Sequence, residues 1–255
     1  MDRTWYADHF RADAARFATA ARKDLESPVP SCPGWTVDVL LGHLTMVVRF
    51  QGAMLRLLPP DGPAPVDLNM ASEGRVEAFE EAADATAAAM ATTDPSVAVW
   101  TWSPNHTAGF WIRRVAQETA VHRWDAENAV GETSPIDPEL AADGIAELLE
   151  EFVPSGRLPL LAPDGTVVQR ESGATASGDG CSLHIHTTDI EVEWVVRMEP
   201  KGVAIERGHE KCDLAVRGAA QDVLLLLWGR TPPSPVDQLG DTTVLDLWRE
   251  AISLD

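Results

Sequence analysis

Residues 117–125 (QETAVHRWD) lie within a proline-free segment, about residues 108–129, that is rich in helix-forming residues. The segment therefore predicts one long helix. Glu118 and His122 are four residues apart, so both side chains lie on one face of that helix, with Cβ atoms about 5–6 Å apart. A carboxylate and an imidazole at this spacing can bind one cation, as in the metal sites of helical bundles.

A third candidate ligand, His43, lies in an apolar segment, residues 36–58. Its hydrophobic residues recur every three or four positions, which predicts a helix with His43 on the core-facing side. Together with Glu118 and His122, it would form a set of two histidines and one carboxylate, which leaves a coordination position open, as catalytic zinc sites do. Spacing alone leaves two other interpretations open: a solvated Glu/His pair on a helix face, and a hydrogen-bonded core histidine.

Four segments resemble the mycothiol-dependent maleylpyruvate isomerase family. Residues 29–44 (VPSCPGWTVDVLLGHL) and 113–127 (RRVAQETAVHRWDAE) resemble its two signatures, and residues 213–224 (DLAVRGAAQDVL) and 227–232 (LWGRTP) resemble its C-terminal domain. The resemblance implies a two-domain α+β protein. We expect a DinB-like four-helix bundle with up-and-down topology over residues 1–132 and a small α+β sandwich, similar to sterol-carrier proteins, over residues 137–255.

The resemblance also implies the site. In that family a cation, usually zinc, is held by a histidine of the first signature and by a glutamate and a histidine of the second, which correspond to His43, Glu118 and His122. An arginine of the C-terminal domain faces the metal cleft and helps to bind an anionic substrate, and Arg230 is the matching position. Three further arginines are alternatives for that role: Arg49, Arg56 and Arg75.

The activity that the resemblance implies depends on mycothiol, the low-molecular-weight thiol of actinobacteria, as co-substrate. A thiolate held by the metal attacks a small electrophilic substrate, which makes the protein an S-transferase or an isomerase. The sequence contains no residue that selects maleylpyruvate itself. Two alternatives remain open: a metal-dependent hydrolase that uses bound water, and a non-enzymatic protein that binds a small apolar ligand.

Charge and hydropathy limit the partners. The chain has 20 Lys and Arg against 40 Asp and Glu, a formal net charge of −20, which argues against nucleic acid and against anionic membranes as partners. No apolar run approaches the roughly 20 residues that span a bilayer, and the N-terminus lacks a signal-peptide pattern. We expect a cytoplasmic monomer or homodimer.

The remaining pattern predicts helices and strands in both halves of the chain. Further helices are expected over residues 4–25, 72–91, 138–152, 219–228 and 244–252. Strands are expected over residues 166–169, 181–187, 192–198, 202–206 and 213–217, forming a meander with helices on one face. A flexible turn is expected over residues 173–180.

Several other histidine, aspartate and cysteine side chains are possible functional residues. His184 and His186 share one strand face, but no third ligand lies nearby in sequence, so we interpret them as a sheet-face pair. Asp125 either steadies an imidazole or pairs with a neighbouring arginine, Arg114 or Arg123. We expect Cys32 to fill a turn, and we assign no role to three more histidines: His9, His106 and His209.

Overall fold

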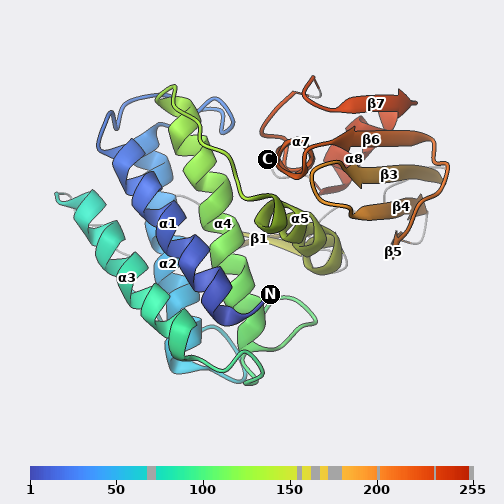
Figure 1. Ribbon diagram of the computed structural model, residues 1–255. Helices are drawn as coiled ribbons and strands as arrows, with labels where there is room; N and C mark the ends of the chain where they lie inside the picture. The colour runs from blue at the N-terminus through green and yellow to red at the C-terminus, as the bar shows by residue number, and fades with distance from the viewer. Residues whose placement is uncertain are drawn as a thin grey trace. The chain divides into compact units, whose positions relative to one another are not determined.

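The computed structural model describes residues 1–67, 73–153, 157–161, 167–171, 180–199, 202–232 and 234–252. The chain divides into two compact units, Met1–Ser134 with Pro159–Val168, and Pro135–Leu158 with Gln169–Asp255. The first unit is helical and the second contains a small mixed sheet with helices (Figure 1). The predicted α+β fold class is therefore confirmed. The domain limits at residues 132 and 137 remain a prediction.

Four long helices form the bundle: α1 (Arg3–Ala21), α2 (Val37–Leu57), α3 (Arg75–Thr92) and α4 (Ala108–Ala129). The limits of α4 agree with the prediction, whereas α1 ends before residue 25 and α3 begins after residue 72. Thr36 caps α2, because its hydroxyl accepts a hydrogen bond from the Val39 amide and so satisfies one of the free N–H groups of the first turn.

The helices pack so that α1 and α2 each contact both α3 and α4, whereas α1 and α2 barely touch. α1 and α2 therefore lie across a diagonal of the bundle, whereas α2 and α3 are neighbours. The core between them is built from large apolar side chains that are almost fully buried, including Phe10, Phe17, Leu40, Leu44, Phe79 and Trp111.

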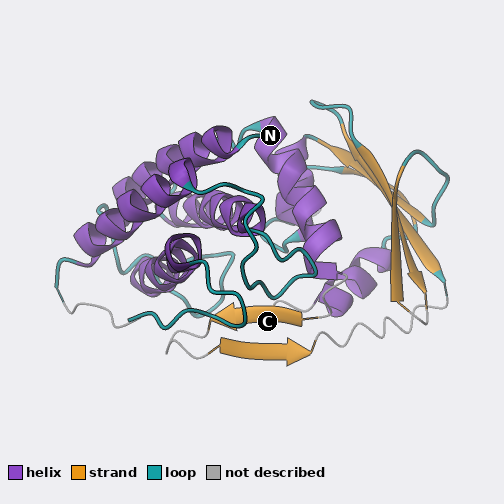
Figure 2. Ribbon diagram, turned by 90° about the horizontal axis from the view of Figure 1, so that it is seen from below, coloured by secondary structure: helices purple, strands orange, loops and turns teal. Residues whose placement is uncertain are grey.

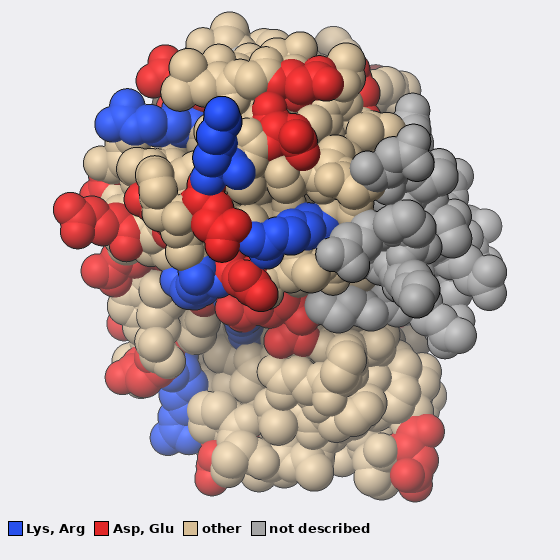
Figure 3. All heavy atoms as spheres, turned by 90° about the vertical axis from the view of Figure 1, so that its right-hand side faces the viewer, with Lys and Arg blue, Asp and Glu red and all other residues tan. Residues whose placement is uncertain are grey.

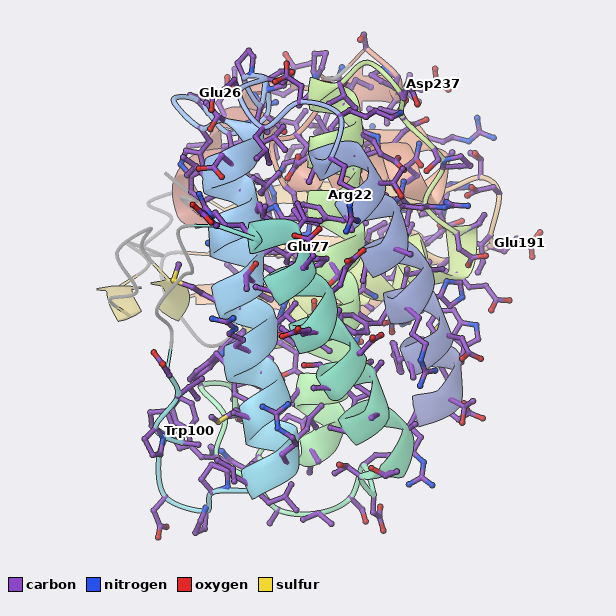
Figure 4. The ribbon with its side chains drawn as sticks, turned by 90° about the vertical axis from the view of Figure 1, so that its left-hand side faces the viewer. Arg22, Glu26, Glu77, Trp100, Glu191 and Asp237 are labelled. Carbon is purple, nitrogen blue, oxygen red and sulfur yellow. The ribbon has the colours of Figure 1, made fainter. Side chains whose placement is uncertain are left out.

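Contacts at the helix ends give the helix directions. Arg22, just after α1, pairs with Glu77 in the first turn of α3, and the two side chains point toward one another in Figure 4, so these helices are antiparallel. Arg75 at the start of α3 pairs with Asp38 at the start of α2, so those helices are parallel. The Trp100 amide, in the loop before α4, donates to the Pro59 carbonyl after α2, so α2 and α4 are antiparallel.

The helices thus run up, down, down, up, and the predicted alternating topology was wrong. The reason lies in the length of the connector, residues 58–74. An extended chain of that length spans about 50 Å, more than the roughly 30 Å of a helix such as α2. The chain can therefore return along α2 before α3 begins, which a short loop would not allow.

The second unit begins with α5 (Pro138–Glu147), which continues as a π-helical turn, η1 (Leu148–Phe152). A five-stranded sheet follows: β3 (Cys181–Thr187), β4 (Glu193–Glu199), β5 (Gly202–Arg207), β6 (Leu214–Gly218) and β7 (Asp237–Gly240). Two helices complete it, α7 (Ala220–Leu227) and α8 (Thr243–Ile252). A separate two-stranded sheet pairs β1 (Arg157–Leu161) with β2 (Val167–Glu171). The predicted turn over residues 173–180 lies almost entirely outside the described residues.

The strand order of the large sheet is β5-β4-β3-β6-β7. β3, β4 and β5 form an antiparallel meander, but β6 crosses over to pair in parallel with β3, with Leu183 opposite Leu214. The predicted simple meander was therefore wrong at β6. Since β5 is an edge strand, the next strand had to pair either with β5 or with the free edge of β3, and sequence order does not distinguish these edges.

The two faces of this sheet differ in character. One face carries apolar side chains that are buried, among them Leu183, Ile185, Trp194 and Val196, and both α7 and α8 contact β3. Figure 2 shows the sheet nearly edge-on. The alternate positions, which include His184, His186 and Glu193, point to the other face.

Charge is distributed without a basic patch on the surface drawn in Figure 3, where acidic side chains lie beside the basic ones. Among the described residues, no helix has the length and apolar character needed to cross a membrane.

Candidate metal centre

Two neighbouring antiparallel helices, α2 and α4, position the three predicted ligands. Glu118 and His122 lie one turn apart on α4, and His43 lies in the second turn of α2. His43 and His122 are 8% and 6% exposed, and the side chain of Glu118 is 20% exposed. The site is therefore nearly closed, with the carboxylate at its most open side.

The donor atoms of the three side chains converge on one point. Nε2 of His43 lies 3.4 Å from Oε1 of Glu118, and Nε2 of His122 lies 3.2 Å from the same oxygen. The two imidazole rings meet edge-on, with centroids 5.1 Å apart. The structure therefore brings together all three residues that the sequence analysis selected.

These distances fit a metal ion. Zinc bound tetrahedrally at about 2.0–2.1 Å holds its ligand atoms about 3.3–3.4 Å apart, close to the two separations between histidine and glutamate. In addition, Nδ1 of His43 is buried and has no hydrogen-bond partner among the described residues. A metal bound at Nε2 would leave this atom unpaired, so the evidence for His43 as a ligand comes from the distances to Nε2.

Asp125 orients the imidazole of His122. Its Oδ2 lies 2.9 Å from Nδ1 of His122, and the carboxylate is fully buried. A carboxylate that accepts a hydrogen bond from Nδ1–H keeps the proton on Nδ1 and leaves Nε2 free to bind a metal. The sequence predicted two possible roles for Asp125, orienting an imidazole or pairing with an arginine. The contact with His122 corresponds to the first of these roles.

The loop of the first signature contacts the same carboxylate. The hydroxyl of Ser31 donates a hydrogen bond to Oδ1 of Asp125, and Sγ of Cys32 lies 4.0 Å from Oδ2. Cys32 lies in a turn, as predicted from its neighbours. Segments 29–44 and 113–127 thus meet at Asp125 as well as at the three candidate ligands.

Arg114 donates a hydrogen bond to the second carboxylate oxygen of Glu118. Its Nη2 donates to Oε2 at 2.8 Å from one turn earlier on α4. Burial alone would raise the pKa of Glu118, but the charge of Arg114 and the hydrogen bonds with His122 and His43 outweigh it and hold the pKa well below its usual value. Glu118 is therefore an anion at neutral pH, with Oε1 directed at both imidazoles.

His122 is correspondingly held in its charged form when no metal is present. Burial alone would lower its pKa, but the hydrogen bonds with Asp125 and Glu118 raise it to about 9. A divalent cation would replace that proton, because the two carboxylates that stabilise the imidazolium also stabilise a metal bound to Nε2.

The candidate arginines lie in different places. Arg230 follows α7, where its amide donates to the Leu225 carbonyl and its Nη1 donates to the Trp228 carbonyl, so it takes part in the C-terminal cap of that helix. Arg75 is engaged with Asp38 on α2, and Arg56 is exposed near the end of α2. The role of Arg230 in substrate binding remains a proposal.

A second cluster was only half anticipated. His184 and His186, interpreted above as a sheet-face pair, lie together with Glu193 and His209, and the four side chains could hold a metal ion. Glu193, which lies shortly after His186 in sequence, was not singled out, and His209 was assigned no role because it lies near a predicted strand end. The one available signal was the hairpin, whose register places Glu193 opposite His186.

The fold and the site together define a two-domain α+β protein with a candidate metal centre of two histidines and one glutamate in a helical bundle. Residues 7–127 match the family model described as the mycothiol maleylpyruvate isomerase N-terminal domain, and residues 139–247 match the model of its C-terminal domain. The chain therefore belongs to the mycothiol-dependent maleylpyruvate isomerase family, which is a family of enzymes.

Solved structures agree with this assignment at the level of the fold. The chain is similar to the crystal structure of the mycothiol-dependent maleylpyruvate isomerase, with a TM-score of 0.58 and 12% sequence identity. It is also similar to a histidine-to-alanine mutant of that enzyme, with a TM-score of 0.59 and 12% identity. Each comparison covers 93% of both chains. A comparison with curated proteins finds no match to the sequence.

Proposed function

We propose that this protein is a metal- and mycothiol-dependent enzyme, an S-transferase or an isomerase, that acts on a small electrophilic substrate. The observation that supports this most directly is the convergence of His43 Nε2 and His122 Nε2 on Glu118 Oε1, within 3.4 Å. Family membership supports mycothiol as the thiol. Both reaction types share one step, in which the thiolate sulfur forms a bond to an electrophilic carbon.

A divalent metal, zinc in the first instance, would act as a Lewis acid with an open position that stabilises the thiol as a thiolate. His43, Glu118 and His122 would hold it. Asp125 fixes the tautomer of His122, and Arg114 restrains the second oxygen of Glu118. The near-complete burial of both histidines keeps bulk water away from the ligands, which strengthens every charge interaction in the site.

The two reaction types differ in what happens to the carbon–sulfur bond. In an isomerase, addition of the thiolate to a carbon–carbon double bond permits rotation about the resulting single bond. The carbon–sulfur bond then breaks, which releases the thiol and restores the double bond. In an S-transferase the adduct is the product.

We assign Arg230 to the binding of an anionic group of the substrate, on the family resemblance. Replacing Arg230 with Gln should then raise KM for an anionic electrophile more than it lowers kcat, and should leave KM for a neutral one unchanged.

Metal content is the first test. The purified parent, reloaded with zinc and desalted, should contain one more zinc per chain than His122→Ala, measured by elemental analysis. His106→Ala is the matched control, because it removes an exposed histidine from the loop before α4. Equal zinc content in the parent and in His122→Ala would overturn the assignment of the ligands.

Thiol dependence is the second test. The zinc-loaded parent should consume mycothiol in the presence of an α,β-unsaturated carbonyl compound, and His122→Ala should not. Turnover that is independent of any thiol would instead support a hydrolase. Loss of zinc with no reaction toward any electrophile tried, together with uptake of an apolar ligand, would support a binding protein.

A further inference from the structure

The outer face of the C-terminal sheet carries the second cluster of histidines. His184 and His186 project from β3, Glu193 is the first residue of β4, and His209 follows β5. Their ligand atoms all lie within 4.8 Å of one another. Residues far apart in sequence are thus gathered at one point by the hairpin that joins β3 and β4 and by the end of β5.

Strand geometry explains how the cluster forms. His184 and His186 lie two residues apart on β3 and therefore point to the same face of the sheet. The antiparallel register pairs His186 directly with Glu193 on β4. Gly208, which precedes His209, donates its amide to the Glu193 carbonyl and has φ +154°. This conformation favours glycine and lets the chain turn so that His209 reaches back over the start of β4.

All three imidazoles share a single carboxylate. Nε2 of His184 lies 2.9 Å and Nδ1 of His209 lies 2.6 Å from Oε2 of Glu193, while Nδ1 of His186 lies 3.4 Å from Oε1. The ring centroids of His184 and His209 are 4.8 Å apart. The separations of 2.9 and 2.6 Å are hydrogen-bond distances, shorter than the roughly 3.3–3.4 Å between ligand atoms of one zinc ion, so a bound cation would replace these hydrogen bonds and move the ligand atoms slightly apart.

We propose that His184, His186, Glu193 and His209 form a second divalent-metal site, built entirely from the C-terminal unit and independent of the bundle centre. Three imidazoles and one carboxylate favour zinc, with copper and nickel as competitors, over calcium or magnesium, which prefer oxygen ligands. His184 is nearly buried, whereas the side chain of His209 is 73% exposed. The ion should therefore exchange readily with solution, and when bound it would join β3, β4 and the end of β5.

Zinc binding to His122→Ala tests the proposal, because that substitution removes a ligand of the bundle centre and leaves the sheet intact. Titration calorimetry should give one site per chain with a Kd of about 10 μM or tighter. Adding His209→Ala should weaken binding by at least about tenfold, since losing a ligand costs no less than losing a residue that supports one. His209 is exposed, so its loss should not prevent folding; adding His106→Ala instead should leave the Kd unchanged.

Copper binding gives a second readout that does not depend on activity. Electron paramagnetic resonance of His122→Ala with one equivalent of Cu²⁺ should show nitrogen couplings from the imidazoles, and the variant that also carries His209→Ala should show fewer. No zinc binding by His122→Ala, or identical Kd and nitrogen couplings with and without His209, would overturn the proposal. Failure of the bundle centre would not affect this result, because both experiments are performed without it.

Discussion

The two histidine clusters of this chain use the same residue types but differ in how uniformly their side chains are buried and in which residues support them. In the bundle, His43 and His122 are 8% and 6% exposed, and the ligands are held in place by Asp125 and Arg114. On the sheet, His209 has a side chain that is 73% exposed, and the three imidazoles contact Glu193 and one another.

The difference shows what separates a site that can support chemistry from one that can only bind. Supporting residues hold ligands in the geometry that a reaction needs, and burial removes competing water. The bundle has both features, whereas the sheet cluster has neither to the same extent. This contrast supports the proposals that catalysis takes place at the bundle centre and that the sheet binds a metal reversibly, and four predictions test it.

The largest difference is expected when the same substitution is made in each cluster. Glu118→Gln should weaken zinc binding to the bundle by about 100-fold or more, because the lost charge also balances Arg114 and His122. Glu193→Gln should weaken the sheet site by only about tenfold, since three imidazoles remain. Chelator competition measures each value, with His209→Ala weakening the sheet site in the first case and His122→Ala removing a ligand of the bundle in the second. Equal losses in the two sites would contradict the contrast.

Removing the support of His122 should have the next largest effect. Asp125→Asn keeps the shape of the side chain but removes its charge, and zinc affinity of the bundle should fall by about 10–100-fold. The same competition assay measures it in the His209→Ala background. Asp8→Asn, at a side chain that is 68% exposed, is the control and should behave as the parent. A drop of less than about twofold would show that Asp125 has only a structural role.

The pH dependence of the bundle site follows from the pKa of about 9 for His122. Zinc must displace that proton, so affinity should rise by up to about tenfold per pH unit from pH 7 toward 9 and then level off. In metal-free protein the sign is reversed: the charged His122 stabilises the fold fully below about pH 6.5, and this contribution is lost as the pH rises through about 9. Thermal melting of the chelator-treated parent and of chelator-treated His122→Gln, measured from about pH 6 to 9.5, tests this. The melting temperature should lose the contribution of His122 with rising pH in the parent only.

The smallest effects are expected in the loop of the first signature. Ser31→Ala removes a hydrogen bond to Asp125 and should reduce zinc affinity of the bundle by about fivefold. Cys32→Ser should change it by less than about twofold, because the 4.0 Å contact of its sulfur with Asp125 is long. If Cys32→Ser has the greater effect, the thiol has a role that the present geometry does not explain.

Much of the bundle could be predicted from local sequence. The period of three to four residues in α2 and the uninterrupted helical segment of α4 were sufficient to locate both helices, and the spacing of Glu118 and His122 required them to share a face. The direction of each helix was not accessible, because long connectors permit either a parallel or an antiparallel neighbour. The predicted alternating topology was wrong for that reason.

The sheet illustrates the opposite limit. Alternation along β3 showed that His184 and His186 share a face, but the partners of that pair depend on register and on strand order. Glu193 is brought in by the hairpin and His209 by the end of β5, and neither is close to the pair in sequence. The crossover of β6 to the free edge of β3 was missed for the same reason.

The sequence by itself located the helices of the bundle and placed Glu118 and His122 on one helix face, because these features depend on local periodicity and on spacing within a helix. The fold class and the choice of His43 as the third ligand came from the resemblance of the sequence to the family. Only the tertiary structure decided which oxygen of Glu118 faces the imidazoles, that Asp125 supports His122, and that four residues meet on the sheet. Those features arise from contacts between elements distant in the chain, and their geometry is set by how the elements pack rather than by any local preference.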